Sequence, residues 1–317
     1  MTDARPVAPP DGTGRVTTIC VPDSEGARLA QPLPEGVETL VWDGSAAPPE
    51  GVERTEFWVP PFGAPYEAMV AAMPHLRVVQ ARTAGVDMLI SVVPDGATLC
   101  DGRGVHGVAT SEWVLTAILS SLREFPGFVR AQERREWASR MTDELAGKRV
   151  LVVGAGDVGE QIARRLRAFD AEPTMVARHA REGVHAIEEV HELLPQSDVV
   201  VLVVPMTEET RALADGKFLA TMSDGALLVN ASRGPVVVTD ALLAELESGR
   251  LHAALDVTDP EPLPADHPLW SAPNLLLTPH VGGGVYSLPS RSYRLVREQV
   301  ARYVSSTPLL NVVDGAY

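Results

Sequence analysis

The chain has 317 residues, 45% hydrophobic and 22% charged, which is the balance of a globular protein with a buried core and about two domains. Its formal charge of −15 disfavours a polyanionic partner, so we expect no nucleic-acid binding. Two cysteines, Cys20 and Cys100, are too few for a disulfide framework or a metal-ligand set. We therefore expect reduced thiols, no bound metal and a cytoplasmic location.

The amino-terminal sequence predicts neither secretion nor membrane insertion. MTDARPVAPPDGTGR (1–15) has no apolar core of a signal peptide, and its Pro, Gly and polar content is typical of a loose tail. No apolar run approaches the roughly 20 residues that span a bilayer. We expect no membrane association.

The first third of the chain alternates short strands with helical segments. Apolar runs punctuated by Pro and Gly predict strands at 16–22, 36–42, 54–60 and 76–81, and residues 66–76 have helical spacing. A long helical stretch follows at 109–137, and we expect a break near Pro126 and Gly127. Thr110 or Ser111 is the expected cap of this helix.

A second alternation begins at residue 147. Continuous apolar runs predict strands at 149–153, 174–178, 198–205, 225–232, 252–257 and 274–279, and 292–306 returns to an amphipathic helix. Continuous runs are typical of parallel strands covered on both faces. The sequence thus predicts an α/β fold of two Rossmann-like lobes with parallel sheets, the second (109–284) inserted into the first (1–108 and 285–317).

A glycine motif opens the second lobe. Gly154, Gly156 and Gly159 form G-x-G-x-x-G directly between a predicted strand and a predicted helix. This context allows a tight turn, close approach of the backbone to a pyrophosphate, and close packing of helix on strand. We predict dinucleotide binding here, with contacts that include Asp157 and Val158 inside the motif.

The acid that usually ends the next strand is missing. Sites specific for NAD place Asp or Glu there to accept hydrogen bonds from the ribose 2′-hydroxyl, whereas this chain has Ala177 followed by Arg178 and Arg181. Arginines bind phosphate through a planar fork, so the sequence favours NADP(H), with NAD(H) possible. The alternative is that both arginines are solvated surface charges, and nearby Glu182 weakens the positive field.

Three later segments carry a resemblance to a known family. In order they read VNASRGPVVVTDALLAELESGRLHAALDV, TDPEPLPADHPLWSAPN and LLLTPHVGG. This order resembles the D-isomer-specific 2-hydroxyacid dehydrogenases, which include glyoxylate/hydroxypyruvate reductases and phosphoglycerate dehydrogenases. The resemblance runs from AGVD (84–87) to PLLNVVD (308–314) and is strongest over 147–284.

The resemblance implies catalytic roles for a few residues. Arg233 corresponds to the arginine that grips the substrate carboxylate and carbonyl, His280 to the catalytic histidine, Glu261 to its acidic partner, and Asp256 to an acid near the nicotinamide. A guanidinium can bind the carboxylate of a 2-keto acid while it orients the ketone. Protonated His280 can then donate to the carbonyl oxygen, and a carboxylate at Glu261 stabilises the imidazolium and fixes its orientation.

Further positions follow from the same resemblance. The expected substrate-carboxylate loop comprises Thr83, Ala84 and Gly85, and further expected cofactor contacts are Pro205, Thr210 and Ala231. Taken singly, each of these is an ordinary loop residue, as are Arg233, Glu261 and His280. The prediction rests on their joint order behind the glycine motif.

The leading hypothesis is an NADPH-dependent reductase that converts glyoxylate, hydroxypyruvate or another small 2-keto acid to the D-2-hydroxy acid. The resemblance implies a homodimer formed through 109–137. The alternatives are a dinucleotide-sensing, corepressor-like protein and a biosynthetic dehydrogenase for a larger 2-keto or 2-hydroxy acid. Ala84 replaces the lysine of phosphite-oxidising members, and GVHGVATSEW lacks an asparagine segment of the formate-oxidising branch. The early end of the chain disfavours a large allosteric phosphoglycerate dehydrogenase.

Overall fold

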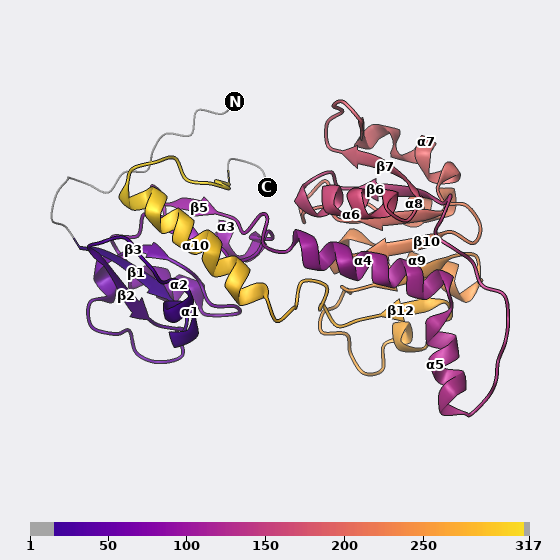
Figure 1. Ribbon diagram of the computed structural model, residues 1–317, viewed down its shortest axis with the longest axis horizontal. Helices are drawn as coiled ribbons and strands as arrows, with labels where there is room; N and C mark the ends of the chain where they lie inside the picture. The colour runs from indigo at the N-terminus through magenta and orange to yellow at the C-terminus, as the bar shows by residue number, and fades with distance from the viewer. Residues whose placement is uncertain (1–15, 314–317) are drawn as a thin grey trace. The chain divides into compact units, whose positions relative to one another are not determined.

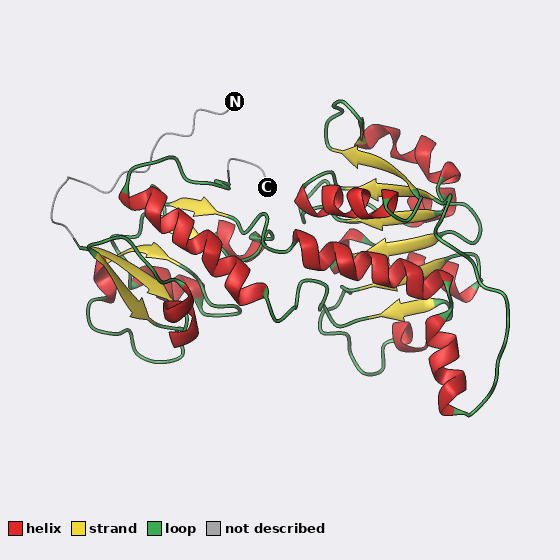
Figure 2. Cartoon of the chain, in the orientation of Figure 1, coloured by secondary structure: helices red, strands yellow, loops and turns green. Residues whose placement is uncertain are grey.

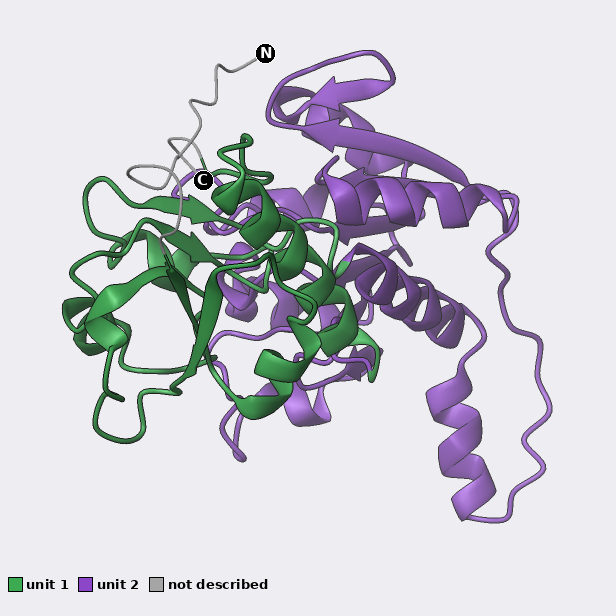
Figure 3. Cartoon of the chain, turned by 60° about the vertical axis from the view of Figure 1, so that its left-hand side comes forward, with its two compact units in different colours: residues 1–106, 286–317 green, residues 107–285 purple. Residues whose placement is uncertain are grey.

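The computed structural model describes residues 16–313, and the tail predicted over 1–15 lies outside the described residues. The chain divides into two compact units, coloured separately in Figure 3. Unit 1 runs to His106 and resumes at Tyr286, and unit 2 comprises Gly107–Val285. Unit 2 is therefore inserted into the sequence of unit 1.

Unit 1 is built on a five-stranded parallel sheet with strand order β2-β1-β3-β4-β5 (Figures 1 and 2). Side chains alternate along β1, because Ile19 and Val21 pack in a cluster with α10 while Cys20 packs in a cluster with α2 and α3. The elements are β1 Thr17–Val21, α1 Ser24–Leu29, β2 Val37–Val41, η1 Val52–Arg54, β3 Thr55–Trp58, α2 Tyr66–Ala71, β4 Val78–Gln80, α3 Asp87–Ile90, β5 Thr98–Cys100 and α10 Leu288–Val304.

Unit 2 is built on a seven-stranded parallel sheet with strand order β12-β11-β10-β9-β6-β7-β8. Its elements are α4 Gly107–Leu122, α5 Phe125–Glu133, β6 Arg149–Val153, α6 Asp157–Arg167, β7 Glu172–Ala177, β8 Val184–Ala186, η2 Ile187–Glu189, α7 Val190–Leu193, η3 Leu194–Gln196, β9 Val199–Leu202, α8 Gly216–Thr221, β10 Leu227–Asn230, η4 Gly234–Val236, α9 Thr239–Glu247, β11 His252–Leu255, η5 Pro268–Ser271 and β12 Leu275–Leu277.

Both faces of the larger sheet are covered, which explains why its strands read as continuous apolar runs. Along β6, Val150 and Val152 pack in a cluster with α4 and α6, and Leu151 and Val153 pack in a cluster with α7, α8 and α9. The α/β fold with two parallel-sheet lobes is confirmed. All strands of this sheet run parallel, so the loops after β6, β7, β9, β10, β11 and β12 start at one edge, called here the carboxyl edge.

The predicted helical stretch 109–137 was wrong in detail. Helix α4 already begins at Gly107, so Thr110 and Ser111 lie inside it rather than at its cap. The break comes at Glu124, whose φ is 53°, and Pro126 lies in the first turn of α5, where a missing backbone N–H costs nothing. The short strands β5 and β8 were not predicted, because neither of their sequences, TLC and VHA, lies in a continuous apolar run.

Candidate functional site

The glycine turn after β6 has three distinct constraints. Gly154 has a φ of 118°, and a side chain there would strike the Val203 carbonyl. A side chain on Gly159 would strike the carbonyl of Gly154, so this glycine allows α6 to pack against the turn. Beside Gly156, by contrast, there is open space, since a Cβ built there meets no atom within 4 Å. The turn at the start of α6 therefore has room for the pyrophosphate of a dinucleotide.

The two motif residues between these glycines occupy different surroundings. Asp157 is the first residue of α6, and its carboxylate lies against Gly107 at the start of α4. Val158 is half-buried and packs against the core cluster that contains α6.

The arginines after β7 make different contacts. Strand β7 ends at Ala177, and the guanidinium of Arg178 forms an ion pair with Glu209, with 3.0 Å between Nη2 and Oε1. Arg181 instead donates from Nη2 to the carbonyl of Ala155 in the glycine turn, at 2.6 Å. The loops after β6, β7 and β9 thus meet at the carboxyl edge. The prediction did not include Glu209, which lies in the loop after β9.

The loop after β9 is closed by its own hydrogen bonds. The Thr210 hydroxyl donates to the Pro205 carbonyl at 2.6 Å and accepts from the Thr207 backbone N–H at 2.8 Å. Thr210 therefore shapes this loop, and its predicted contact with a phosphate stays a prediction. Ala231, the residue after β10, is tied to the same region because its N–H donates to the Leu202 carbonyl at 3.1 Å.

His280 and Glu261 are in direct contact. Nδ1 of His280 lies 2.6 Å from Oε1 of Glu261, and the side chains are 47% and 40% exposed. His280 follows β12 in the left-handed region with a φ of 53°, which is strained for a residue with a side chain. Its backbone N–H donates to the Asp256 carbonyl at 2.7 Å, so a hydrogen bond to the residue after β11 helps to hold this conformation.

Asp256 holds the loop that carries His280, called here the histidine loop, in place through hydrogen bonds. Its carboxylate is buried and accepts hydrogen bonds from the Thr278 hydroxyl at 2.6 Å and from the N–H groups of Val281 and Gly282 at 2.9 Å and 2.7 Å. The indole N–H of Trp113, on α4, donates to the Thr278 hydroxyl at 3.0 Å. The prediction did not include Trp113 or Thr278, although Thr278 lies two residues before His280 in the segment LLLTPHVGG.

Arg233 lies in the loop after β10. Its Nη1 donates to the Ser232 carbonyl at 2.8 Å, and its own carbonyl accepts from the side chain of Asn230 at 3.0 Å. The next residue, Gly234, packs so closely on the Thr258 carbonyl that a side chain would clash. The Arg233 loop therefore lies beside the segment that leads to Glu261.

The remaining predicted loop belongs to unit 1. Thr83, Ala84 and Gly85 follow β4 at the carboxyl edge of the smaller sheet, where the Thr83 hydroxyl donates to the Gly85 carbonyl at 2.7 Å. The Gly102 N–H donates to the Thr83 carbonyl at 2.7 Å and fixes the loop against the turn after β5.

Residues 16–313 include neither a metal-ligand cluster nor a helix that could span a membrane. No three or more His, Cys, Asp or Glu side chains in this range are arranged to hold a metal ion. None of the helices in the same range is both long enough and apolar enough to span a bilayer.

Comparisons with known proteins identify the family of this chain. Residues 115–282 match the family model described as "D-isomer specific 2-hydroxyacid dehydrogenase, NAD binding domain". The mouse glyoxylate reductase/hydroxypyruvate reductase is 32% identical over 230 residues, which cover 68% of this chain and 70% of the relative. A D-3-phosphoglycerate dehydrogenase of Methanocaldococcus jannaschii is 29% identical over 252 residues, which cover 75% of this chain and 48% of the relative. The chain thus spans about half the length of that enzyme.

A solved structure covers nearly the whole chain. The NADPH-dependent glyoxylate/hydroxypyruvate reductase of Sinorhizobium meliloti, in complex with NADP and sulfate, superimposes with a TM-score of 0.80 and 27% identity. The match covers 94% of this chain and 98% of that one, so the likeness includes both units.

Proposed function

The chain belongs to the D-isomer-specific 2-hydroxyacid dehydrogenase family and is an NAD(P)-dependent oxidoreductase, and from this premise we propose that it reduces a small 2-keto acid with NADPH. The substrates we propose are of the glyoxylate and hydroxypyruvate class, and the product is the D-2-hydroxy acid. The observation that carries the proposal is the 2.6 Å contact between His280 and Glu261, on loops at the same carboxyl edge of the sheet as the dinucleotide turn.

His280 is the proposed proton donor. Because Nδ1 is engaged by Glu261, Nε2 is the ring nitrogen left to transfer a proton. As the carbonyl carbon is reduced, protonated His280 gives the Nε2 proton to the carbonyl oxygen and becomes neutral, with its remaining N–H directed at Glu261. The Arg233 guanidinium binds the substrate carboxylate and orients the ketone.

The proposed cofactor contacts are the glycines of the turn after β6 together with Asp157, Val158, Pro205, Thr210, Ala231 and Asp256. The bound nicotinamide cofactor supplies the hydride. The open space beside Gly156 at the start of α6 suits its pyrophosphate. Three observations support a preference for NADP(H) over NAD(H). Position 177 carries alanine instead of an acid, and Arg178 and Arg181 follow it closely. The Sinorhizobium enzyme was solved in complex with NADP.

Unit 1 is the proposed substrate-binding domain, in which the backbone of Thr83, Ala84 and Gly85 receives the substrate carboxylate. Unit 2 is the proposed dinucleotide-binding domain, which is supported by the family match over 115–282. The two cysteines are free and buried, which is consistent with the cytoplasmic location we propose.

A homodimer is proposed through an arm, which consists of α5 and the segment 134–148 that joins it to β6. In Figure 1 this arm projects from the rest of unit 2. Phe125, Val129, Trp137 and Met141 on the arm are 57%, 54%, 98% and 96% exposed, an apolar surface that a second copy would cover. Sedimentation velocity of the wild type beside Trp137→Ser tests this proposal, and a monomeric wild type would refute it.

The first experiment compares initial rates of glyoxylate reduction with NADPH and NADH at matched concentrations. Robust turnover that is faster with NADPH supports both the reaction and the cofactor preference. Faster turnover with NADH would contradict the preference alone. If neither cofactor supports turnover of glyoxylate or hydroxypyruvate, the second candidate becomes the stronger. It is a dehydrogenase for a larger 2-hydroxy acid, which is favoured by the similarity to D-3-phosphoglycerate dehydrogenase.

A further inference from the structure

The residue that opposes Arg178 lies outside the usual position for cofactor discrimination. In a Rossmann lobe the ribose 2′ substituent is read at the end of the second strand, here Ala177, where this chain has no acid. The structure brings a carboxylate to the neighbouring residue from elsewhere. Glu209, 31 residues further along the chain, pairs with Arg178 at 3.0 Å.

The two arginines after β7 are not equivalent in this respect. Arg181 donates from Nη2 to the carbonyl of Ala155 and so ties its side chain to the glycine turn. Arg178 has an acid as its partner, and Arg178 and Glu209 are 58% and 60% exposed. A cofactor phosphate that approaches Arg178 therefore meets both charges at a surface open to solvent.

Glu209 is an anion at neutral pH. A hydrogen bond from Thr207, then one from its own backbone, and then the positive charge of Arg178 hold the pKa of Glu209 below its ordinary value. Such a carboxylate accepts hydrogen bonds from a ribose hydroxyl, and it repels a phosphate dianion. Its chemistry is thus the reverse of that of Arg178.

We infer that Glu209 is a specificity-determining residue that supplies, from the loop after β9, the carboxylate missing at position 177. It favours NAD(H) by accepting from the 2′-hydroxyl, and it disfavours NADP(H) by repelling the 2′-phosphate and competing for Arg178. The inference rests on the cofactor site of the proposed function. It makes the preference for NADP(H) a balance between Arg178 and Glu209, so that removing Glu209 strengthens the preference.

The test measures dissociation constants rather than turnover. Titration calorimetry gives the Kd of NADP⁺ and of NAD⁺ for the wild type, Glu209→Gln and the control Glu208→Gln, which removes an exposed charge one residue away. Because both partners are exposed, we expect Glu209→Gln to raise the ratio Kd(NAD⁺)/Kd(NADP⁺) roughly 3- to 10-fold. Glu208→Gln should leave that ratio near the wild-type value.

Two results would overturn the inference. One is a ratio that Glu209→Gln leaves unchanged or moves no further than Glu208→Gln does. The other is an equal weakening of both cofactors by Glu209→Gln, since that would mean that Glu209 only shapes its loop. A wild type that binds NAD⁺ more tightly would contradict the preference under Proposed function, while the change caused by Glu209→Gln would still decide the role of Glu209. Binding of neither cofactor to the wild type would refute both.

Discussion

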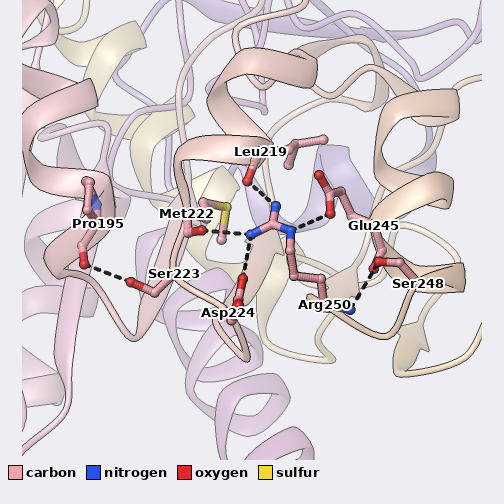
Figure 4. A network of polar contacts seen from close by, with 8 residues as sticks. All are labelled: Pro195, Leu219, Met222, Ser223, Asp224, Glu245, Ser248 and Arg250. Carbon is pink, nitrogen blue, oxygen red and sulfur yellow. Dashed lines mark hydrogen bonds and ion pairs between the residues drawn. The ribbon is translucent and has the colours of Figure 1, made fainter.

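The two edges of the seven-stranded sheet use polar side chains in opposite ways. At the amino edge, Arg250 precedes β11 and is enclosed by acceptors (Figure 4). Its Nε donates to Glu245 at 2.6 Å, and its Nη1 and Nη2 donate to the carbonyls of Met222 and Leu219 at 2.8 Å and 2.6 Å. At the carboxyl edge, His280 is strained and half-exposed, and one ring nitrogen lies outside its contact with Glu261.

The difference between the two edges indicates that Arg250 serves the stability of the unit, whereas His280 serves its chemistry. Each of the three nitrogens of the Arg250 guanidinium donates to an acceptor at the carboxyl end of α8 or α9, so this side chain stabilises the unit. A histidine at positive φ costs free energy, and the hydrogen bonds that the N–H groups of Val281 and Gly282 donate to the Asp256 carboxylate offset that cost. Variants at the two edges should therefore lose different properties.

The largest effect is expected from His280→Ala. Loss of the proton donor should lower kcat for glyoxylate roughly 100- to 10,000-fold, while the Kd of NADPH stays near the wild-type value. Steady-state rates and fluorescence titration measure the two quantities. His185→Ala is a matched control, because His185 contacts Glu189 at 2.8 Å with both side chains 44% exposed. An equal loss of kcat in both variants would show that His280 has no special role as the proton donor.

Arg250→Met should show the reverse pattern. It leaves the Leu219 and Met222 carbonyls and Glu245 without their donor, which should lower the free energy of unfolding by about 2–3 kcal/mol. Urea unfolding measures this change, and kcat/KM of the folded variant should stay within about twofold of wild type. Arg250→Lys retains the charge but not the planar fork of the guanidinium, so its free energy of unfolding should lie between those of the wild type and Arg250→Met. A large fall in kcat/KM without lost stability would contradict the comparison.

Parts of this arrangement could be predicted from sequence, and the reason is physical. A turn that must pass close to a carbonyl requires glycine, so Gly154 and Gly159 mark the dinucleotide turn wherever the fold places it. Parallel strands that are covered on both sides must be apolar on both faces, so most strands of the larger sheet could also be predicted from the sequence. Glu209 and Trp113 were not, because their partners are 31 and 165 residues away and only the folded chain joins them.

Thr278→Val sharpens the comparison inside the carboxyl edge. The variant keeps the shape of the side chain but removes the hydroxyl between Trp113 and the buried Asp256 carboxylate. One lost hydrogen bond to a buried charge, worth about 1.5 kcal/mol, should lower kcat roughly 5- to 15-fold if the histidine loop shifts. Thr278→Ser restores the hydroxyl and should restore most of kcat. Equal loss of kcat in Val and Ser variants would mean that the methyl packing, not the hydrogen bond, positions the loop.

The smallest effect is expected from Arg178→Ala, since both members of its ion pair are exposed and screened by solvent. Its KM for NADPH should rise roughly 3- to 10-fold more than its KM for NADH, because only the former carries the 2′-phosphate. Arg181→Ala is the informative partner: its guanidinium is tied to the Ala155 carbonyl, so it should weaken both cofactors through the glycine turn. Equal effects of Arg178→Ala on the two cofactors would make Arg178 a surface charge. Discrimination would then have to come from other residues, and the carboxyl edge would be functional at His280 but not at β7.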